Sequence, residues 1–105
     1  MGNEVGFMKG LITGQRRLAV LRWLLATPGY CLNDQLLAAM LRKAALFHGG
    51  ESLRDDLEHL ERAGAVRLRR IDSLIVAELT RRGGEAAEGL VELDGVPRPG
   101  VECPY

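Results

Sequence analysis

The sequence predicts a single α+β domain that is mainly helical, with three helices, a two-stranded hairpin and a short closing helix. Apolar residues recur every three or four positions between residues 15 and 64, which is typical of helices that bury one face. After Gly64 the apolar spacing falls to two, which is typical of strands. The 105 residues suit one domain, so we divide the chain into an N-terminal arm (1–14), a folded domain (15–91) and an extended Pro-rich tail (92–105).

The arm carries a glycine at every fourth position, with apolar residues between the glycines. On a helix this spacing would make a stripe of small residues suited to close helix contacts. Each glycine, however, lowers helix propensity by about 1 kcal/mol relative to alanine. We therefore favour a flexible arm that docks through its apolar residues over a helix; the glycines are Gly2, Gly6, Gly10 and Gly14.

The first helix is expected from Gln15, because leucines then recur at helical spacing until Thr27, Pro28 and Gly29 end the pattern. A short strand or an extended link at residues 30–32 follows. Asn33 can cap a second helix, which we expect to end near Phe47.

A third helix is expected from about Glu51, with an inward face formed by Leu53, Leu57 and Leu60 and with Gly64 at its C-terminal end. Val66 and Leu68 then alternate with arginines, and residues 71–73 can turn the chain into a return strand over residues 74–79. Thr80 can cap a last helix that runs to about Leu90, and the prolines beyond it exclude a further helix.

The net charge is zero, with 14 basic and 14 acidic residues, but charges of opposite sign are segregated along the chain. Residues 51–64 hold two basic and five acidic side chains, whereas residues 65–82 hold five basic and two acidic ones. A locally basic segment is compatible with nucleic acid as a partner even when the total charge is neutral.

Two passages resemble bacterial regulators of the ArsR and MarR families. Residues 57–66, LEHLERAGAV, are similar to the passage that joins the recognition helix to the wing in those families, and residues 78–83, ELTRRG, are similar to the passage where the wing enters the next helix. The resemblance spans about 75 residues and implies a winged helix-turn-helix fold. That fold is used most often to bind DNA.

A narrower resemblance is to small winged-helix proteins of Mu-like bacteriophages, whose biochemical role is unknown. It rests on the passage LTRRGGEAAEG at residues 79–89 and on GVPRP at residues 95–99. It implies a protein that acts in the cytoplasm of a bacterial host cell.

The candidate DNA-binding residues are arginines of the third helix, of the outward face and tip of the hairpin, and of the residues just after the hairpin. Arginine suits phosphate contacts because it is always charged and presents several donors. The alternative to phosphate contact is that these arginines form a solvated face, which protects an edge hairpin from aggregation. The candidate DNA-binding residues are Arg54, Arg67, Arg69, Arg70, Arg81 and Arg82.

Two features depart from the regulators. Leu36 and Leu53, the apolar anchors of the second and third helices, are seventeen residues apart instead of about eleven, so the turn between these helices is expanded. The positions expected to enter the major groove also include three acidic residues, Glu51, Asp55 and Asp56. Carboxylates there repel the DNA backbone, which favours an alternative function, a protein-interaction module that meets a basic partner through these residues and the tail.

Neither catalysis nor a cofactor is indicated. Ser52 and Ser73 show no motif that would bring a base and an orienting group to a nucleophile. The spacing does not support a metal site that would use Cys31, Cys103, His48 and His59.

A homodimer is expected through the first helix and the arm. Apolar residues occupy more than one face of that helix, and a monomer of this size would hardly bury all of them. The residues concerned are Val20, Leu21, Trp23, Leu24 and Leu25.

Overall fold

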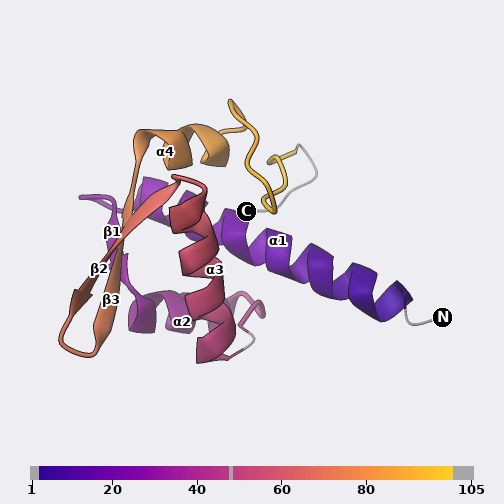
Figure 1. Ribbon diagram of the computed structural model, residues 1–105, viewed down its shortest axis with the longest axis horizontal. Helices are drawn as coiled ribbons and strands as arrows, with labels where there is room; N and C mark the ends of the chain where they lie inside the picture. The colour runs from indigo at the N-terminus through magenta and orange to yellow at the C-terminus, as the bar shows by residue number, and fades with distance from the viewer. Residues whose placement is uncertain (1–2, 48, 101–105) are drawn as a thin grey trace.

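The computed structural model describes residues 3–47 and 49–100, and this part of the chain contains four helices and one three-stranded antiparallel sheet (Figure 1). The predicted α+β class is confirmed, and about half of the chain is helical. None of the described helices is long and apolar enough to cross a membrane. In chain order the elements are α1 (Asn3–Ala26), β1 (Cys31–Asn33), α2 (Asp34–Lys43), α3 (Gly50–Arg62), β2 (Val66–Ile71), β3 (Leu74–Leu79) and α4 (Arg81–Ala87).

The first helix is twelve residues longer at its N-terminus than the sequence predicted, because α1 begins at Asn3 and not at Gln15. The prediction of a flexible arm is therefore wrong for the described residues. Helix propagation is easier than nucleation, so the well-packed second half of α1 can carry the helix through residues of low propensity that include no proline. The N-terminal half of α1 projects away from the rest of the molecule (Figure 1).

The sheet has the order β1-β3-β2, so the return strand of the hairpin lies in the centre. β3 pairs with β2 along its full length, from Val66 opposite Leu79 to Ile71 opposite Leu74, and with the short β1 on its other edge. The predicted strand after the first helix and the predicted hairpin are both confirmed. The hairpin turns at Asp72, which has a φ of 55°.

Capping side chains fix the starts of α2 and α4, as the sequence predicted. The Asn33 side chain accepts a hydrogen bond from Leu36 N at 2.8 Å, and Thr80 Oγ1 accepts one from Gly83 N at 3.1 Å. These bonds satisfy backbone donors that have no partner within the first turn of a helix. Gly64 ends α3 with a φ of 80°, also as expected.

Two helices end earlier than predicted. α2 ends at Lys43 and not near Phe47, because Ala45 turns the chain with a φ of 58° and Leu46 N donates to Leu41 O at 2.8 Å. α4 likewise ends at Ala87 instead of continuing to about Leu90. There Gly89 has a φ of 81°, a backbone conformation that suits glycine.

The core lies between α1, the other helices and one face of the sheet, and the described tail helps to close it. Leu93 is buried, and Leu93 and Val96 form a tight β-bridge around Gly95. This turn corrects the prediction that the tail is extended throughout. Pro97 lies against Gly14 of α1, since a Cβ at that glycine would be 3.1 Å from Pro97 Cδ.

The second half of α1 is buried within the chain itself. Val20, Leu21 and Leu24 are all 0% exposed, while Trp23 and Leu25 are half-buried. One chain therefore buries most of these residues. The expectation of a homodimer rested on their not being buried in a monomer, and that reason is wrong. The exposed apolar residues of α1 lie in its N-terminal half instead: Phe7, Met8 and Leu11.

Candidate nucleic-acid interface

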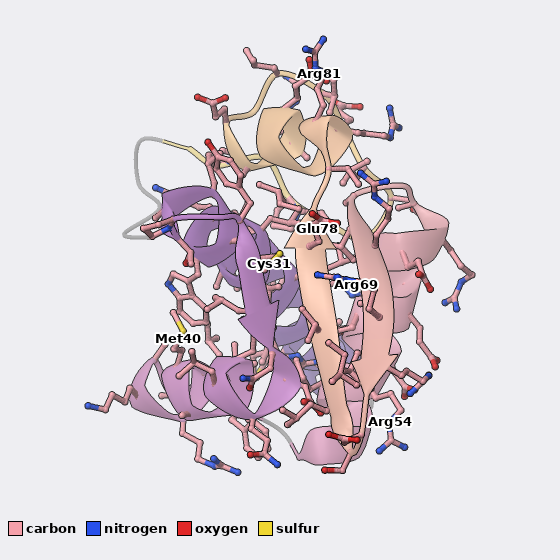
Figure 2. All side chains as sticks on the ribbon, turned by 90° about the vertical axis from the view of Figure 1, so that its left-hand side faces the viewer. Cys31, Met40, Arg54, Arg69, Glu78 and Arg81 are labelled. Atoms are coloured by element: carbon pink, nitrogen blue, oxygen red, sulfur yellow. The ribbon has the colours of Figure 1, made fainter. Side chains whose placement is uncertain are left out.

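The hairpin places two of the candidate arginines on the face of the sheet that points away from the core. Side chains alternate between faces along a strand, and Val66 and Leu68 of β2 point toward the core, so Arg67 and Arg69 point outward. Figure 2 looks onto this outer face and labels Cys31, Glu78 and Arg69 on its three strands. No helix of the described chain covers it (Figure 1).

These two arginines are only weakly engaged by other groups of the described chain. Arg67 lies opposite Glu78 across the ladder, with 3.9 Å between Arg67 Nε and Glu78 Oε1, and its side chain is 74% exposed. Such a long, exposed ion pair contributes little to stability. Arg69 has no hydrogen-bond or ion-pair partner among the described residues, so both side chains are available to a ligand.

Arg70 lies on the opposite face of β2 from Arg67 and Arg69. Its Nη2 is 3.9 Å from Glu58 Oε2 of α3, again a loose and exposed pair. The prediction that Arg67, Arg69 and Arg70 share the outward face and tip of the hairpin is therefore wrong for Arg70, because side chains alternate between the two faces of a strand. Together with Arg54 of α3 and Asp34 of α2, Arg70 lines a hollow of about 270 Å³ beside the hairpin tip.

Arg81 and Arg82 lie at the other end of the hairpin, in the first turn of α4, and both are exposed. Arg82 Nε donates to Ala63 O at 3.1 Å, so this side chain braces the end of α3. Arg81 and Arg54 appear at opposite ends of the view in Figure 2, with Arg69 between them. The candidate arginines thus form a broken line along the hairpin rather than one compact patch.

Asp56 does not lie on the exposed face of α3. It is 1% exposed, and its carboxylate accepts hydrogen bonds from Arg16 Nε and, at 2.9 Å, from Arg17 Nε. The prediction that Asp56 faces a groove or a partner is therefore wrong. The sequence does contain the signal, because Asp56 falls within the buried helical series formed by Leu53, Leu57 and Leu60.

Without Asp56, the exposed face of α3 keeps a small excess of negative charge, with Asp55, Glu58 and Glu61 against Arg54 and Arg62. Asp55 is exposed, Glu58 faces Arg70, and Glu61 Oε2 accepts a hydrogen bond from Leu68 N at 3.1 Å. The side chain of Glu51 lies outside the part of the structure that is described. These carboxylates offer no hydrogen-bond donor to a guanine edge or to a phosphate.

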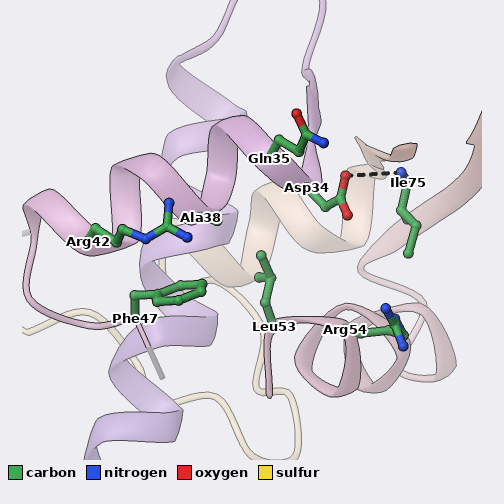
Figure 3. A pocket seen from close by; sticks show the side chains of 8 residues that line it. All are labelled: Asp34, Gln35, Ala38, Arg42, Phe47, Leu53, Arg54 and Ile75. Atoms are coloured by element: carbon green, nitrogen blue, oxygen red, sulfur yellow. Dashed lines mark hydrogen bonds between the residues drawn. The ribbon is translucent and has the colours of Figure 1, made fainter. Parts of the chain in front are cut away.

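A second hollow, of about 200 Å³, lies between α2, the start of α3 and the start of β3 (Figure 3). Its polar groups are mostly engaged: Asp34 Oδ1 accepts from Ile75 N at 3.1 Å, and the Arg42 guanidinium lies 4.3 Å from the centre of the Phe47 ring. Arg54 at its edge has no hydrogen-bond or ion-pair partner among the described residues. The two hollows adjoin, because Asp34, Arg54 and Ile75 line both of them.

The structure describes two of the four candidate metal ligands, Cys31 and His59, and does not bring them together. Cys31 lies on the outer face of the sheet, and His59 Nε2 is 2.7 Å from Asp94 O of the tail. His48 and Cys103 lie outside the described residues.

Comparisons of the chain with protein-family models, with curated proteins and with solved structures find no match.

Proposed function

We propose that this chain is a winged-helix protein that holds duplex DNA through phosphate contacts from its hairpin arginines. The observation that carries the proposal is the position of Arg67 and Arg69 on the uncovered face of the sheet, where Arg69 has no partner among the described residues. Residues two apart on a strand are about 7 Å apart, so both guanidinium groups can reach one phosphate backbone at once.

The charges around these arginines favour contacts with the backbone over reading of bases. From residue 65 to residue 82 the chain carries five basic and two acidic side chains. The acidic face of α3 repels phosphate, and in the major groove its carboxylates can accept hydrogen bonds only from the amino groups of cytosine and adenine. Binding is therefore tolerant of sequence, as suits a DNA-handling accessory or a regulator that relies on a partner for specificity.

The order of the elements supports the winged-helix part of the proposal. Helix, strand, helix, helix and hairpin follow one another as in that fold, with β2 and β3 as the wing and α3 in the place of the recognition helix. The resemblance to Mu-like bacteriophage proteins extends the proposal to a role in the cytoplasm of a bacterial host.

A salt titration tests the proposal. Wild type is expected to bind duplexes of unrelated sequence with similar affinity near 50 mM salt, and log K to fall linearly with log salt. In the double variant Arg67→Ala, Arg69→Ala, the slope should flatten by about two units, roughly 0.9 for each lost phosphate contact. The matched control is Arg98→Ala, an exposed arginine of the tail that pairs with Glu92 at 3.4 Å.

Two results would reject DNA binding by the hairpin: no binding by wild type at low salt, or an unchanged slope in the double variant. Flattening by about one unit in the Arg98→Ala control, the same for each arginine removed, would point to net charge alone and would also contradict a specific role for the hairpin.

The acidic face of α3 favours a second candidate, a protein-interaction module for a basic partner. Its contacts would come from Asp55, Glu58 and Glu61, because Asp56 is buried. The described tail contributes less than we expected, since its backbone is engaged by the chain itself: Arg17 Nη1 donates to Gly95 O at 3.2 Å. Binding of a lysine-rich peptide, lost in the variant Asp55→Asn, Glu58→Gln, would support this candidate.

A further inference from the structure

The two adjoining hollows near the hairpin tip share two side chains of opposite charge. Asp34 of α2 and Arg54 of α3 line both the hollow of about 200 Å³ and the one of about 270 Å³. Neither has an ion-pair partner within the described part of the chain. Asp34 engages only Oδ1, which accepts a hydrogen bond from Ile75 N at 3.1 Å. Two opposite charges that border one space without pairing can be bridged by a ligand that carries both signs.

The smaller hollow offers apolar walls directly beside these two charges. Ala38 and Leu53 are 8% and 3% exposed, Phe47 is half-buried, and all three line this hollow. Figure 3 shows Phe47 and Leu53 to the same side of Asp34 and Arg54. Sites for small ligands combine mostly apolar walls with a few polar groups that fix the orientation, in about 300–1,000 Å³. Each hollow is smaller than that, but a ligand can extend from one into the other because they adjoin.

The charges around the larger hollow favour a ligand without net charge. Its lining holds two acidic side chains, Asp34 and Asp72, and two basic ones, Arg54 and Arg70. A phosphate or another simple anion would be repelled by both carboxylates, and a simple amine by both guanidinium groups. A zwitterion is attracted by groups of both signs.

We propose that the adjoining hollows bind a free α-amino acid with an apolar side chain of about the size of leucine. The guanidinium group of Arg54 receives the carboxylate, whose planar geometry matches its paired donors. Asp34 receives the ammonium group at Oδ2, while Oδ1 keeps its hydrogen bond to Ile75. The apolar side chain of the ligand lies against Leu53 and Phe47, where its removal from water favours binding.

Titration of the full chain with leucine, followed by calorimetry and by amide chemical shifts, tests the proposal. A ligand of about nine non-hydrogen atoms is expected to bind with a dissociation constant on the order of 100 micromolar. Isocaproate lacks the ammonium group of leucine, and isoamylamine lacks its carboxylate. Each should bind about tenfold more weakly or worse, as should glycine, which has no apolar side chain. The amide signal of Ile75 should shift when leucine binds, because its N–H donates to Asp34.

Two variants each remove one of the two charges from the chain. Asp34→Asn keeps an oxygen that can accept from Ile75 N, and Arg54→Gln keeps a side chain that favours helix. Both should bind leucine about tenfold more weakly or worse. The matched control is Arg62→Gln, which removes an exposed arginine about two turns further along α3 and should bind leucine like wild type.

Absence of saturable binding by wild type at about 10 millimolar leucine, roughly a hundredfold above the expected dissociation constant, would overturn the proposal. So would equal binding of leucine and either analogue, or a loss in Arg62→Gln as large as that in Arg54→Gln. The analogues are compared on wild type, so that comparison does not depend on the folding of any variant. These measurements use no DNA and do not involve Arg67 or Arg69, so their outcome is independent of the proposed function.

Discussion

Asp56 of α3 accepts a hydrogen bond from Arg17 of α1 at 2.9 Å, and Arg16 donates to the other oxygen of the same carboxylate. Arg16 is 4% exposed, so a charged guanidinium is buried beside its counter-charge. A buried charge is tolerated where it is paired and hydrogen-bonded. The two arginines and Asp56 thus fix how α1 and α3 sit against each other.

The variant Asp56→Ala should therefore lower the free energy of unfolding by about 3–5 kcal/mol, because it leaves a buried guanidinium without a counter-charge. Urea denaturation followed by circular dichroism measures this loss. The neighbouring exposed change Asp55→Ala is the matched control and should stay within about 0.5 kcal/mol of wild type. Equal stability of the two variants would contradict the structural role of Asp56.

Two adjacent glycines of α4 should respond in opposite ways to alanine. A Cβ at Gly83 would collide with Ala65 O and lie 2.7 Å from Leu79 Cδ1, whereas one at Gly84 would lie 3.7 Å from Leu25 Cδ1. Gly83→Ala should therefore destabilise the fold by about 3 kcal/mol, since a backbone carbonyl cannot move aside easily. Gly84→Ala should be neutral or stabilising by up to about 1 kcal/mol, through helix propensity. Thermal unfolding of both variants measures the contrast.

Thr80 links three elements through one hydroxyl group. It accepts a hydrogen bond from Gly83 N and donates one to Gly64 O at 2.6 Å. Thr80→Val keeps the shape but loses both bonds, so it should destabilise by about 1–2 kcal/mol. Thr80→Ser retains the hydroxyl group and should recover most of this difference in urea denaturation.

Removing exposed carboxylates from α3 should strengthen DNA binding if the proposed function holds. The double variant Asp55→Asn, Glu58→Gln removes two negative charges without touching the buried Asp56. Its affinity for duplex DNA should rise several-fold at low salt and less at high salt, because repulsion between exposed charges is screened. Fluorescence anisotropy at two salt concentrations measures this, and unchanged affinity would place the DNA away from α3.

Much of the fold could be predicted because local signals agree with it. Asn33 and Thr80 cap helices, Gly64 ends one, and the change from helical spacing to alternation marks the hairpin. Each of these signals depends on residues close in sequence. The predicted outward position of Arg67 and Arg69 follows from the same alternation and is also found.

Contacts between distant residues account for most of the errors. Asp56 was grouped with Asp55 as an exposed acid, and its partners lie about forty residues away in α1. The docking of the tail depends on Gly14 and Arg17, roughly eighty residues from the segment they hold. The N-terminal extension of α1 was missed for another reason, because propensity alone underestimates propagation from a packed helix.

The contacts of the tail with Gly14 and Arg17 of α1 have a consequence for how the chain folds during synthesis. α1 is synthesised before the other described elements, yet α3, β3, α4 and the residues around Gly95 all pack against it or bond to it. The ribosome adds about 5–20 residues per second, so several seconds pass between the synthesis of α1 and that of these later segments. The native core can be completed only after the residues around Gly95 have been synthesised, so Leu18, Leu21 and Leu24 lack part of their native cover until then.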